Sequence, residues 1–238
     1  KIGIQYLCTP FSIKAAKELY SINVNAFKTG SGELTNYPFI DYIARLRKPM
    51  IVSTGMSKPN EIDETVKIIM KYNTPLALTH CVSAYPCPYE IMNLDYIKEL
   101  SKKYNIPVGL SDHTPSIYNA LGAVSLGASI IEKHFTFDKK LDGPDHKSSI
   151  DKKELEELIK GVKANFLARG TDKKIHDQEK EIVSWARESV VSIKNIDRGE
   201  KLSIKNISTK RPTPKKNQIS ANKYFKLLGK RVKKYIPK

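Results

Sequence analysis

Short runs of apolar residues recur along the first 135 residues, and the stretches between them have the polar–apolar spacing of amphipathic helices. Each run predicts a strand. The six runs are Ile4–Cys8, Val24–Lys28, Met50–Ser53, Leu76–His80, Val108–Leu110 and Ser129–His134. Regular alternation of strand and helix is typical of a parallel sheet with helices outside it. The pattern therefore predicts an α/β fold for this part of the chain.

Three of the helical stretches carry a start signal. Pro59 stands in the first turn of one, Thr114 and Pro115 open another, and Asp151 with Glu154 resembles a capping box. The last helix has its apolar residues on one face, and these are Leu155, Leu158, Ile159, Val162 and Phe166.

The number of strand–helix units favours an incomplete barrel. A closed eight-stranded barrel usually takes about 250 residues, whereas residues 1–170 supply six units. We expect a (β/α)8 TIM-type barrel over residues 1–170 that lacks two units, in a chain that begins inside a longer protein. Residues 171–188 are polar and predict a linker. Residues 189–238 predict a small separate domain of strands and turns, beginning with Val190-Val191-Ser192-Ile193.

Charge changes this picture only for the C-terminal part. Residues 201–238 carry 13 Lys and Arg and no Asp or Glu, whereas the first 200 residues hold 28 basic and 25 acidic side chains. Such a tail suits nucleic acid, a solvated surface or a small anionic substrate. It lacks interleaved aromatic residues and nucleic-acid motifs, so we expect no nucleic-acid partner.

Two further features bear on where the protein works. No apolar run is long enough to span a bilayer and no signal-peptide pattern is present, so we expect no membrane partner. The three cysteines, Cys8, Cys81 and Cys87, lack metal-type spacing, and their odd number argues against a disulfide framework. These observations predict a cytoplasmic protein.

Two histidines, His113 and His134, close neighbouring predicted strands. Neutral imidazoles suit a divalent transition metal, and in a barrel the C-terminal strand ends are where chemistry takes place. One ion held between them would make this a metal-assisted enzyme. The alternative is that each histidine is a hydrogen-bonded scaffold residue.

The other predicted strands end in small hydroxyls, glycines and one lysine. These ends include Lys28-Thr29-Gly30-Ser31-Gly32-Glu33, Val52-Ser53-Thr54-Gly55 and Val82-Ser83-Ala84-Tyr85. Glycine lets backbone amides approach a ligand, and hydroxyls and an ammonium donate hydrogen bonds. Such ends favour binding of a phosphate or a carboxylate.

Taken in order, these motifs resemble the sialic acid synthase family, which comprises N-acetylneuraminate synthase and its legionaminate and pseudaminate relatives. The matching stretches are FKTGSGE, IVSTGM, HCVSAYP, GLSDHT, IIEKHFT and GPDHKSS, and VVSIKNIDRGEKLSIKNISTKRP resembles the family's antifreeze-like (SAF) domain. The resemblance implies a (β/α)8 barrel followed by an SAF domain. It also implies a homodimer in which each SAF domain covers the partner's active site.

The resemblance further implies a transferase that forms a carbon–carbon bond. Phosphoenolpyruvate would condense with an N-acetylated hexosamine to give a nonulosonic acid and phosphate, with Mn²⁺ or Mg²⁺ as cofactor. The sugar would be N-acetylmannosamine or a 2,4-diacetamido-6-deoxy analogue, because the SGE and GPDHKSS forms look more like the neuraminate and legionaminate branches.

Site residues follow from the same resemblance. His113 and His134 match the metal ligands, and Glu33 matches an acid near the reacting centre. The positions that match phosphoenolpyruvate contacts are Lys28, Ser31, Ser53, Ser83 and Ser111. The positions that match sugar contacts are Tyr85, Asp145 and, from the partner's SAF domain, Arg211.

Alternatives stay open at this point. Singly, Lys28 could be a solvated lysine, Glu33 a helix-cap acid and Arg211 a surface charge. The family also uses a glutamate after the first barrel strand and a lysine after the second, and this sequence contains neither region. Two other functions would fit the chain: another phosphoenolpyruvate-condensing or aldolase-type barrel, or a non-catalytic basic protein that binds polyanions.

Overall fold

The computed structural model describes residues 3–212, 214, 215 and 217–238. The chain forms two compact units, Lys1–Gly170 and Thr171–Lys238. Each unit has its own hydrophobic core.

A sheet of five parallel strands organises the first unit. The strands are β1 (Phe27–Thr29), β2 (Met50–Ser53), β3 (Leu76–Cys81), β4 (Val108–Asp112) and β5 (Ile131–Lys133), and they lie side by side in chain order. Because each strand pairs with the next one along the chain, every connection crosses the same face of the sheet. This is the arrangement of a half-barrel of the TIM type, not of a doubly wound sheet.

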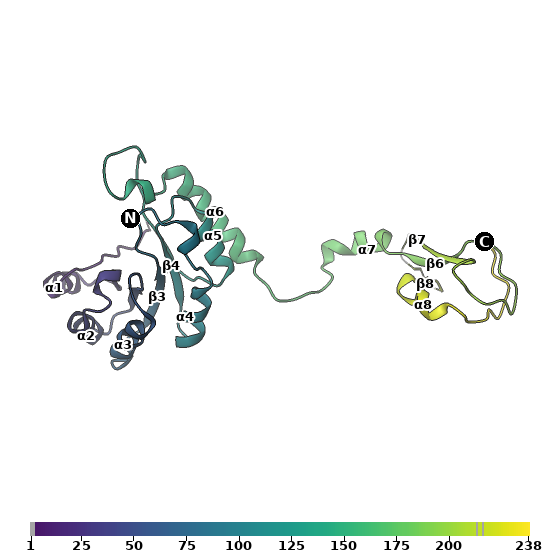
Figure 1. Cartoon of the computed structure of the whole chain (residues 1–238), viewed down its shortest axis with the longest axis horizontal. Helices are drawn as coiled ribbons and strands as arrows, with labels where there is room; N and C mark the ends of the chain where they lie inside the picture. The colour runs from purple at the N-terminus through teal and green to yellow at the C-terminus, as the bar shows by residue number, and fades with distance from the viewer. Residues whose placement is uncertain (1–2, 213, 216) are drawn as a thin grey trace. The chain divides into compact units, whose positions relative to one another are not determined.

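Helices α1 to α6 of the first unit cover the outer face of this sheet (Figure 1). They are α1 (Ile13–Ser21), α2 (Tyr37–Arg45), α3 (Pro59–Met70), α4 (Tyr96–Tyr104), α5 (Tyr118–Ser125) and α6 (Lys152–Ala168). Short 3-10 turns η1 (Ser31–Glu33), η2 (Tyr89–Ile91) and η3 (His146–Ser148) lie in the loops after the strands. The main core fills the space between sheet and helices, with Phe27, Ile43 and Leu78 fully buried in it.

Two predicted helix starts have different outcomes. The capping box of α6 is confirmed: Asp151 accepts a hydrogen bond from the Glu154 amide at 2.9 Å, and Glu154 accepts one from the Asp151 amide at 3.0 Å. The start at Thr114 and Pro115 is wrong, because α5 begins at Tyr118. Asp112 accepts hydrogen bonds from the amide and hydroxyl of Thr114, which hold the chain in a turn before the helix.

Five of the six predicted strands form, but Ile4–Cys8 does not. Most of its side chains stay in solvent: Ile4 is 85% exposed and Leu7 is also exposed, whereas Cys8 is half-buried against the main core. None of the described residues pairs with it in a ladder. An apolar run gains the conformation of a strand from burial together with backbone pairing, and this segment has little burial and no ladder partner among the described residues.

The apolar stripe of α6 is only partly covered. Leu158 is buried between α5 and α6, whereas Phe166 is 64% exposed. The stripe lines an open groove of about 690 Å³ between α6 and β5. Among the described residues β4 is the ladder partner of β5 on one side, and the other side of β5 is open. The exposed stripe therefore lies at the open edge of the half-barrel.

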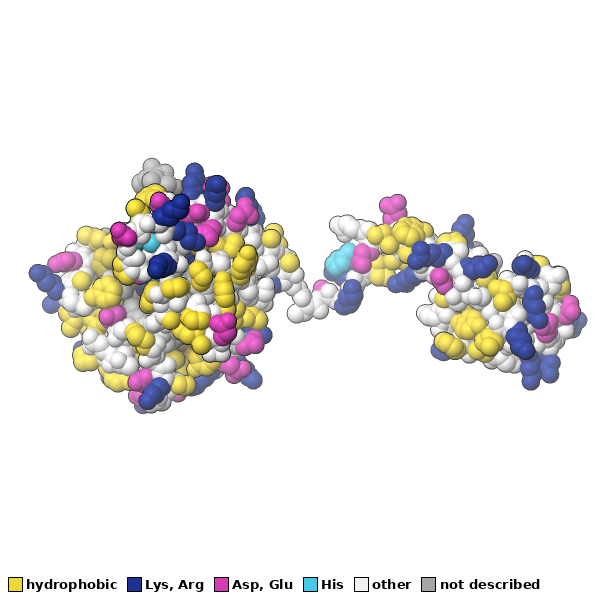
Figure 2. All heavy atoms as spheres, turned by 45° about the horizontal axis from the view of Figure 1, so that its top comes forward, with side chains coloured by type: hydrophobic (Ala, Val, Ile, Leu, Met, Phe, Trp, Pro, Cys, Tyr) yellow, Lys and Arg dark blue, Asp and Glu magenta, His cyan; other side chains and the backbone are white. Residues whose placement is uncertain are grey.

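The second unit is a small antiparallel structure. Its elements are η4 (Asp177–Glu179), α7 (Lys180–Ala186), β6 (Ser189–Ser192), β7 (Ile207–Lys210), β8 (Ile219–Ser220), η5 (Ala221–Lys223) and α8 (Tyr224–Leu227). The strand order is β7-β6-β8, around a core of Ile196, Ile207 and Val232. Residues 171–188, predicted as a linker, contain η4 and α7. Lys and Arg side chains are spread over the surface of this unit (Figure 2).

Neither unit offers a membrane span in the part of the chain that the structure describes, because each helix there is too short or too polar.

Candidate active site

Strand register places the candidate residues on the inner face of the half-barrel. Cys81, Ser111 and Glu132 are successive register partners on β3, β4 and β5, so their side chains point to the same face. Asp112 and Lys133, one position further on, point to the opposite face. The inner face is polar at its C-terminal end, and it carries the residues that the sequence singled out.

Hydroxyl groups converge on one thiol at the ends of β1, β2 and β3. The Ser31 Oγ lies 3.1 Å from the Ser53 Oγ and 3.6 Å from the Cys81 Sγ, and the Cys81 Sγ lies 3.9 Å from the Ser83 Oγ. The Gly55 amide donates to the Ser31 Oγ at 3.1 Å. The cluster combines hydroxyls and a backbone amide, which are donors suited to an anion.

Gly55 is the residue that allows this convergence. A Cβ at this position would lie 2.4 Å from the Ser83 Oγ, 2.6 Å from the Ser31 Oγ and 3.0 Å from the Cys81 Sγ. Any other residue would push these groups apart. The glycine in IVSTGM is thus explained by close approach.

An ion pair crosses the inner face. The Lys28 Nζ lies 3.1 Å from the Glu132 Oε2, and the two side chains are 9% and 41% exposed. The sequence patterns did not single out Glu132 as a site residue. The signal was available, because Glu132 stands two residues before His134 and strand alternation puts both on one face.

Glu33 lies in η1, directly after Ser31. Its Oε2 is buried and has no hydrogen-bond partner among the described residues. A buried carboxylate oxygen without a partner is costly to keep, so this atom is a candidate for contact with a ligand or a proton.

The two predicted histidines come together. The ring centroids of His113 and His134 are 5.2 Å apart, and the Tyr85 ring lies 4.1 Å from the His113 ring. The His113 Nδ1 donates to the Val82 carbonyl at 2.9 Å. This bond fixes the tautomer, so the His113 Nε2 keeps its lone pair free.

Burial and neighbouring groups shift the pKa values of the two histidines and of Cys81. Burial lowers the pKa of His113, but the Cys81 thiol and the Val82 carbonyl outweigh burial and raise it above its ordinary value. Burial and the nearby His113 lower the pKa of His134. Burial raises the pKa of Cys81, yet contacts with His113 and Ser31 outweigh it and lower this pKa to about 7.

The donor set fits a divalent ion. The two imidazoles offer two nitrogen ligands, and Asp145 lies behind one of them, with its Oδ2 3.8 Å from the His134 Nδ1. A carboxylate beside the second ring nitrogen is common for metal-bound histidines. No group of three or more His, Cys, Asp or Glu suited to a metal occurs within residues 3–212, 214, 215 and 217–238. Water or substrate oxygens would therefore have to complete the coordination.

Most predicted site residues thus lie at one end of the half-barrel, on β1–β5 and the loops that follow them. Arg211 is different, because it belongs to the second unit. Its guanidinium carbon lies 5.6 Å from the centre of the Trp185 ring. Its proposed contact with a sugar stays a prediction.

Comparison with known proteins identifies the family. A model of the NeuB family matches residues 1–174, and a model of the SAF domain matches residues 187–238. The chain belongs to the NeuB family. Its fold, a half-barrel followed by an SAF domain, agrees with the fold class that the sequence predicted.

Individual relatives show how far the similarity extends. An uncharacterized protein of Methanocaldococcus jannaschii is 45% identical over 89% of this chain and 64% of its own length. The N,N'-diacetyllegionaminic acid synthase of Campylobacter jejuni is 40% identical over 97% of this chain and 69% of its own length. The crystal structure of a sialic acid synthetase from Leptospira borgpetersenii, in complex with citrate, matches with a TM-score of 0.71 at 35% identity, over 76% of this chain and 64% of that one. The chain spans about two thirds of the length of these NeuB-family relatives.

Proposed function

We propose that this chain carries the phosphoenolpyruvate and metal sites of a nonulosonic acid synthase. In this reaction C3 of phosphoenolpyruvate bonds to the aldehyde carbon of an open-chain N-acetylated hexosamine. One water is consumed and phosphate is released. Membership of the NeuB family supports this reaction class, and the polar inner face of the half-barrel supplies residues for it.

The serine cluster would bind phosphoenolpyruvate. Lys28 supplies a cation, and Ser31, Ser53, Ser83 and Ser111 supply hydroxyls, with the Gly55 amide holding the Ser31 hydroxyl in place. Hydrogen bonds from a cation to a phosphate or carboxylate are about twice as strong as neutral ones, so Lys28 would contribute most. Glu132 holds the Lys28 ammonium through an ion pair at 3.1 Å.

His113 and His134 would hold the divalent ion, Mn²⁺ or Mg²⁺. When bound, such an ion acts as a Lewis acid toward a carbonyl oxygen. The Val82 carbonyl orients the His113 ring through a hydrogen bond, and the Asp145 carboxylate lies 3.8 Å from the His134 Nδ1, beyond hydrogen-bond distance. Both rings must be neutral to bind a metal: the lowered pKa of His134 favours its neutral form, whereas the raised pKa of His113 means that an ion would compete with a proton for that ring.

Glu33 would hold or accept a proton near the reacting carbons. Its unpaired buried oxygen supports this role, since a ligand or proton would satisfy it. Tyr85, whose ring packs on His113, and Asp145 would contact the sugar. In a domain-swapped homodimer Arg211 would reach the sugar from the partner's SAF domain.

The proposal also names the class of sugar substrate. The 40% identity to a legionaminic acid synthase supports a 2,4-diacetamido-6-deoxy hexose. N-acetylmannosamine is the second candidate, because the solved sialic acid synthetase is 35% identical.

The observation that supports the proposal most is that the His113 and His134 rings are adjacent, with the His113 Nδ1 3.8 Å from the Cys81 thiol around which the serine hydroxyls gather. The test is phosphate release from phosphoenolpyruvate with Mn²⁺ and each of the two sugars, repeated with EDTA and with His113→Ala. We expect release that needs the metal, the sugar and His113. Release that persists with EDTA or in the histidine variant would contradict the mechanism.

A further inference from the structure

Behind the two histidines lies a buried ion pair that the sequence did not predict. Asp112 directly precedes His113, and Lys133 directly precedes His134. The two residues are register partners on β4 and β5. Because strand side chains alternate, they face outward while the histidines face the site.

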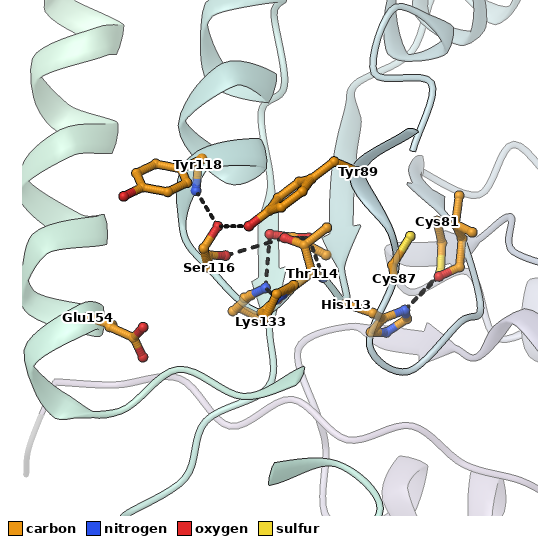
Figure 3. A network of polar contacts seen from close by, with 12 residues as sticks. Cys81, Cys87, Tyr89, His113, Thr114, Ser116, Tyr118, Lys133 and Glu154 are labelled. Carbon is orange, nitrogen blue, oxygen red and sulfur yellow. Dashed lines mark hydrogen bonds and ion pairs between the residues drawn. The ribbon is translucent and has the colours of Figure 1, made fainter. Parts of the chain in front are cut away.

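The side chains of the pair are buried, and each makes further hydrogen bonds. The Lys133 Nζ lies 3.0 Å from the Asp112 Oδ2, and the two side chains are 4% and 0% exposed. The same Nζ donates to the Thr114 carbonyl. The Asp112 Oδ1 accepts from the Thr114 amide at 2.9 Å and from the Thr114 hydroxyl at 2.8 Å. Figure 3 shows Lys133 against Thr114, with the His113 ring directed away from them toward Cys81.

The backbone of each histidine is anchored as well. The Cys87 amide donates to the His113 carbonyl at 2.9 Å, and the Ile150 amide donates to the His134 carbonyl at 2.8 Å. The first bond ties the end of β4 to the loop that follows β3, and the second ties the end of β5 to the loop that follows it. The Asp112–Lys133 pair is a charged side-chain link between the two strand ends.

A buried ion pair contributes little to stability, because removing two charges from water costs about as much as their attraction returns. The best-attested use of such a pair is to select one register or arrangement. Metal sites need this selection, because ligands displaced by a fraction of an ångström bind an ion poorly.

We propose that the Asp112–Lys133 pair is a positioning pair that sets the separation of His113 and His134 for one divalent ion. The inference rests on the proposed function. It goes beyond it in assigning a role to two residues that contact neither substrate nor metal.

The test compares Mn²⁺ affinity with folding. Lys133→Met with Asp112→Asn removes both charges, keeps the Asp112 Oδ1 acceptor as an amide oxygen, and leaves no unpaired buried charge. Mn²⁺ binding is measured by electron paramagnetic resonance of the free ion, and folding by thermal denaturation without metal. We expect the double variant to keep a cooperative transition but to bind Mn²⁺ about tenfold more weakly, the size of effect seen for outer-shell partners of metal ligands.

A second ion pair supplies the matched control. Lys103 and Asp63 join α4 to α3 at 2.6 Å, and their side chains are 49% and 42% exposed. Lys103→Met with Asp63→Asn removes the same charges away from the histidines, so Mn²⁺ affinity should stay within twofold of the parent.

Several outcomes would overturn the inference. If the folded double variant binds Mn²⁺ as the parent does, the pair has no positioning role. If the double variant does not fold, Asp112→Asn alone decides, since it keeps the shape and the Oδ1 acceptor. A loss of threefold or more then supports the inference, and unchanged affinity overturns it. If the folded parent protein binds no Mn²⁺, the proposed function itself is contradicted. The inference then fails too, because it depends on that function.

Discussion

Gly55→Ala is the substitution that should most directly disturb the anion site without touching a charged residue. The new methyl group would overlap the hydroxyl oxygens of Ser31 and Ser83, at 2.6 and 2.4 Å. Both side chains would have to rotate away, and the bond from the Gly55 amide to Ser31 would be strained. The cluster would then open just where phosphoenolpyruvate is proposed to bind.

The magnitude follows from the contacts. Insertion of a methyl group into a packed site costs about 1–3 kcal/mol of unfolding free energy. Two displaced hydroxyls, at about 0.5–1.5 kcal/mol each, weaken binding by about 1–3 kcal/mol, or about fivefold to 150-fold in Kd. The loss of affinity is thus large enough to measure while the protein still folds.

Isothermal titration with phosphoenolpyruvate, together with urea denaturation, tests the prediction. Gly32→Ala is the matched control, because a Cβ at Gly32 would meet no atom within 4 Å. We expect Gly32→Ala to bind like the parent and Gly55→Ala to bind at least fivefold more weakly. Parent-like binding by a folded Gly55→Ala variant would show that the serine cluster is not the anion site.

Other predictions concern individual side chains. Lys28→Met should weaken phosphoenolpyruvate binding by about 1.5–3 kcal/mol, roughly tenfold or more by titration, because a charged donor is lost; equal affinity would argue against Lys28 as a ligand. Glu33→Gln should leave that affinity unchanged but slow phosphate release by about a hundredfold or more, and full activity would exclude a proton-transfer role. Burial lowers the pKa of His80, whose ring bonds the Met92 carbonyl at 2.6 Å. The unfolded chain therefore binds more protons below about pH 6.5, and stability should fall as pH drops below that value. Urea denaturation at pH 7.5 and 5.5 should show a smaller pH effect in His80→Gln, and an equal effect would contradict this assignment.

Sequence patterns predicted the strands correctly where neighbouring strands are present to pair with them. Met50–Ser53 forms as predicted, because its apolar side chains and both ladder partners are present. Ile4–Cys8 has the same pattern but fails, since pairing depends on a neighbour that the pattern cannot supply. The length of an apolar run can be seen in the local sequence, whereas the strand with which it pairs is set by residues elsewhere in the fold.

The site was predictable to a similar degree. His113 and His134 meet because adjacent parallel strands end side by side, which the sequence implied. Glu132 and the Asp112–Lys133 pair were missed, because a charged residue inside a strand pattern is ordinarily taken as solvent-facing. Only the strand register shows that the Glu132 carboxylate faces the site and that the Asp112 carboxylate is buried on the opposite face of the sheet.

Metal binding by His113 and His134 tests the account most directly. Electron paramagnetic resonance of Mn²⁺ titrated with the parent protein, His113→Ala and His134→Ala would measure it. The account predicts one ion bound per chain of the parent, with affinity reduced at least tenfold in each variant. Parent-like uptake in both variants, or no uptake by the folded parent, would contradict it.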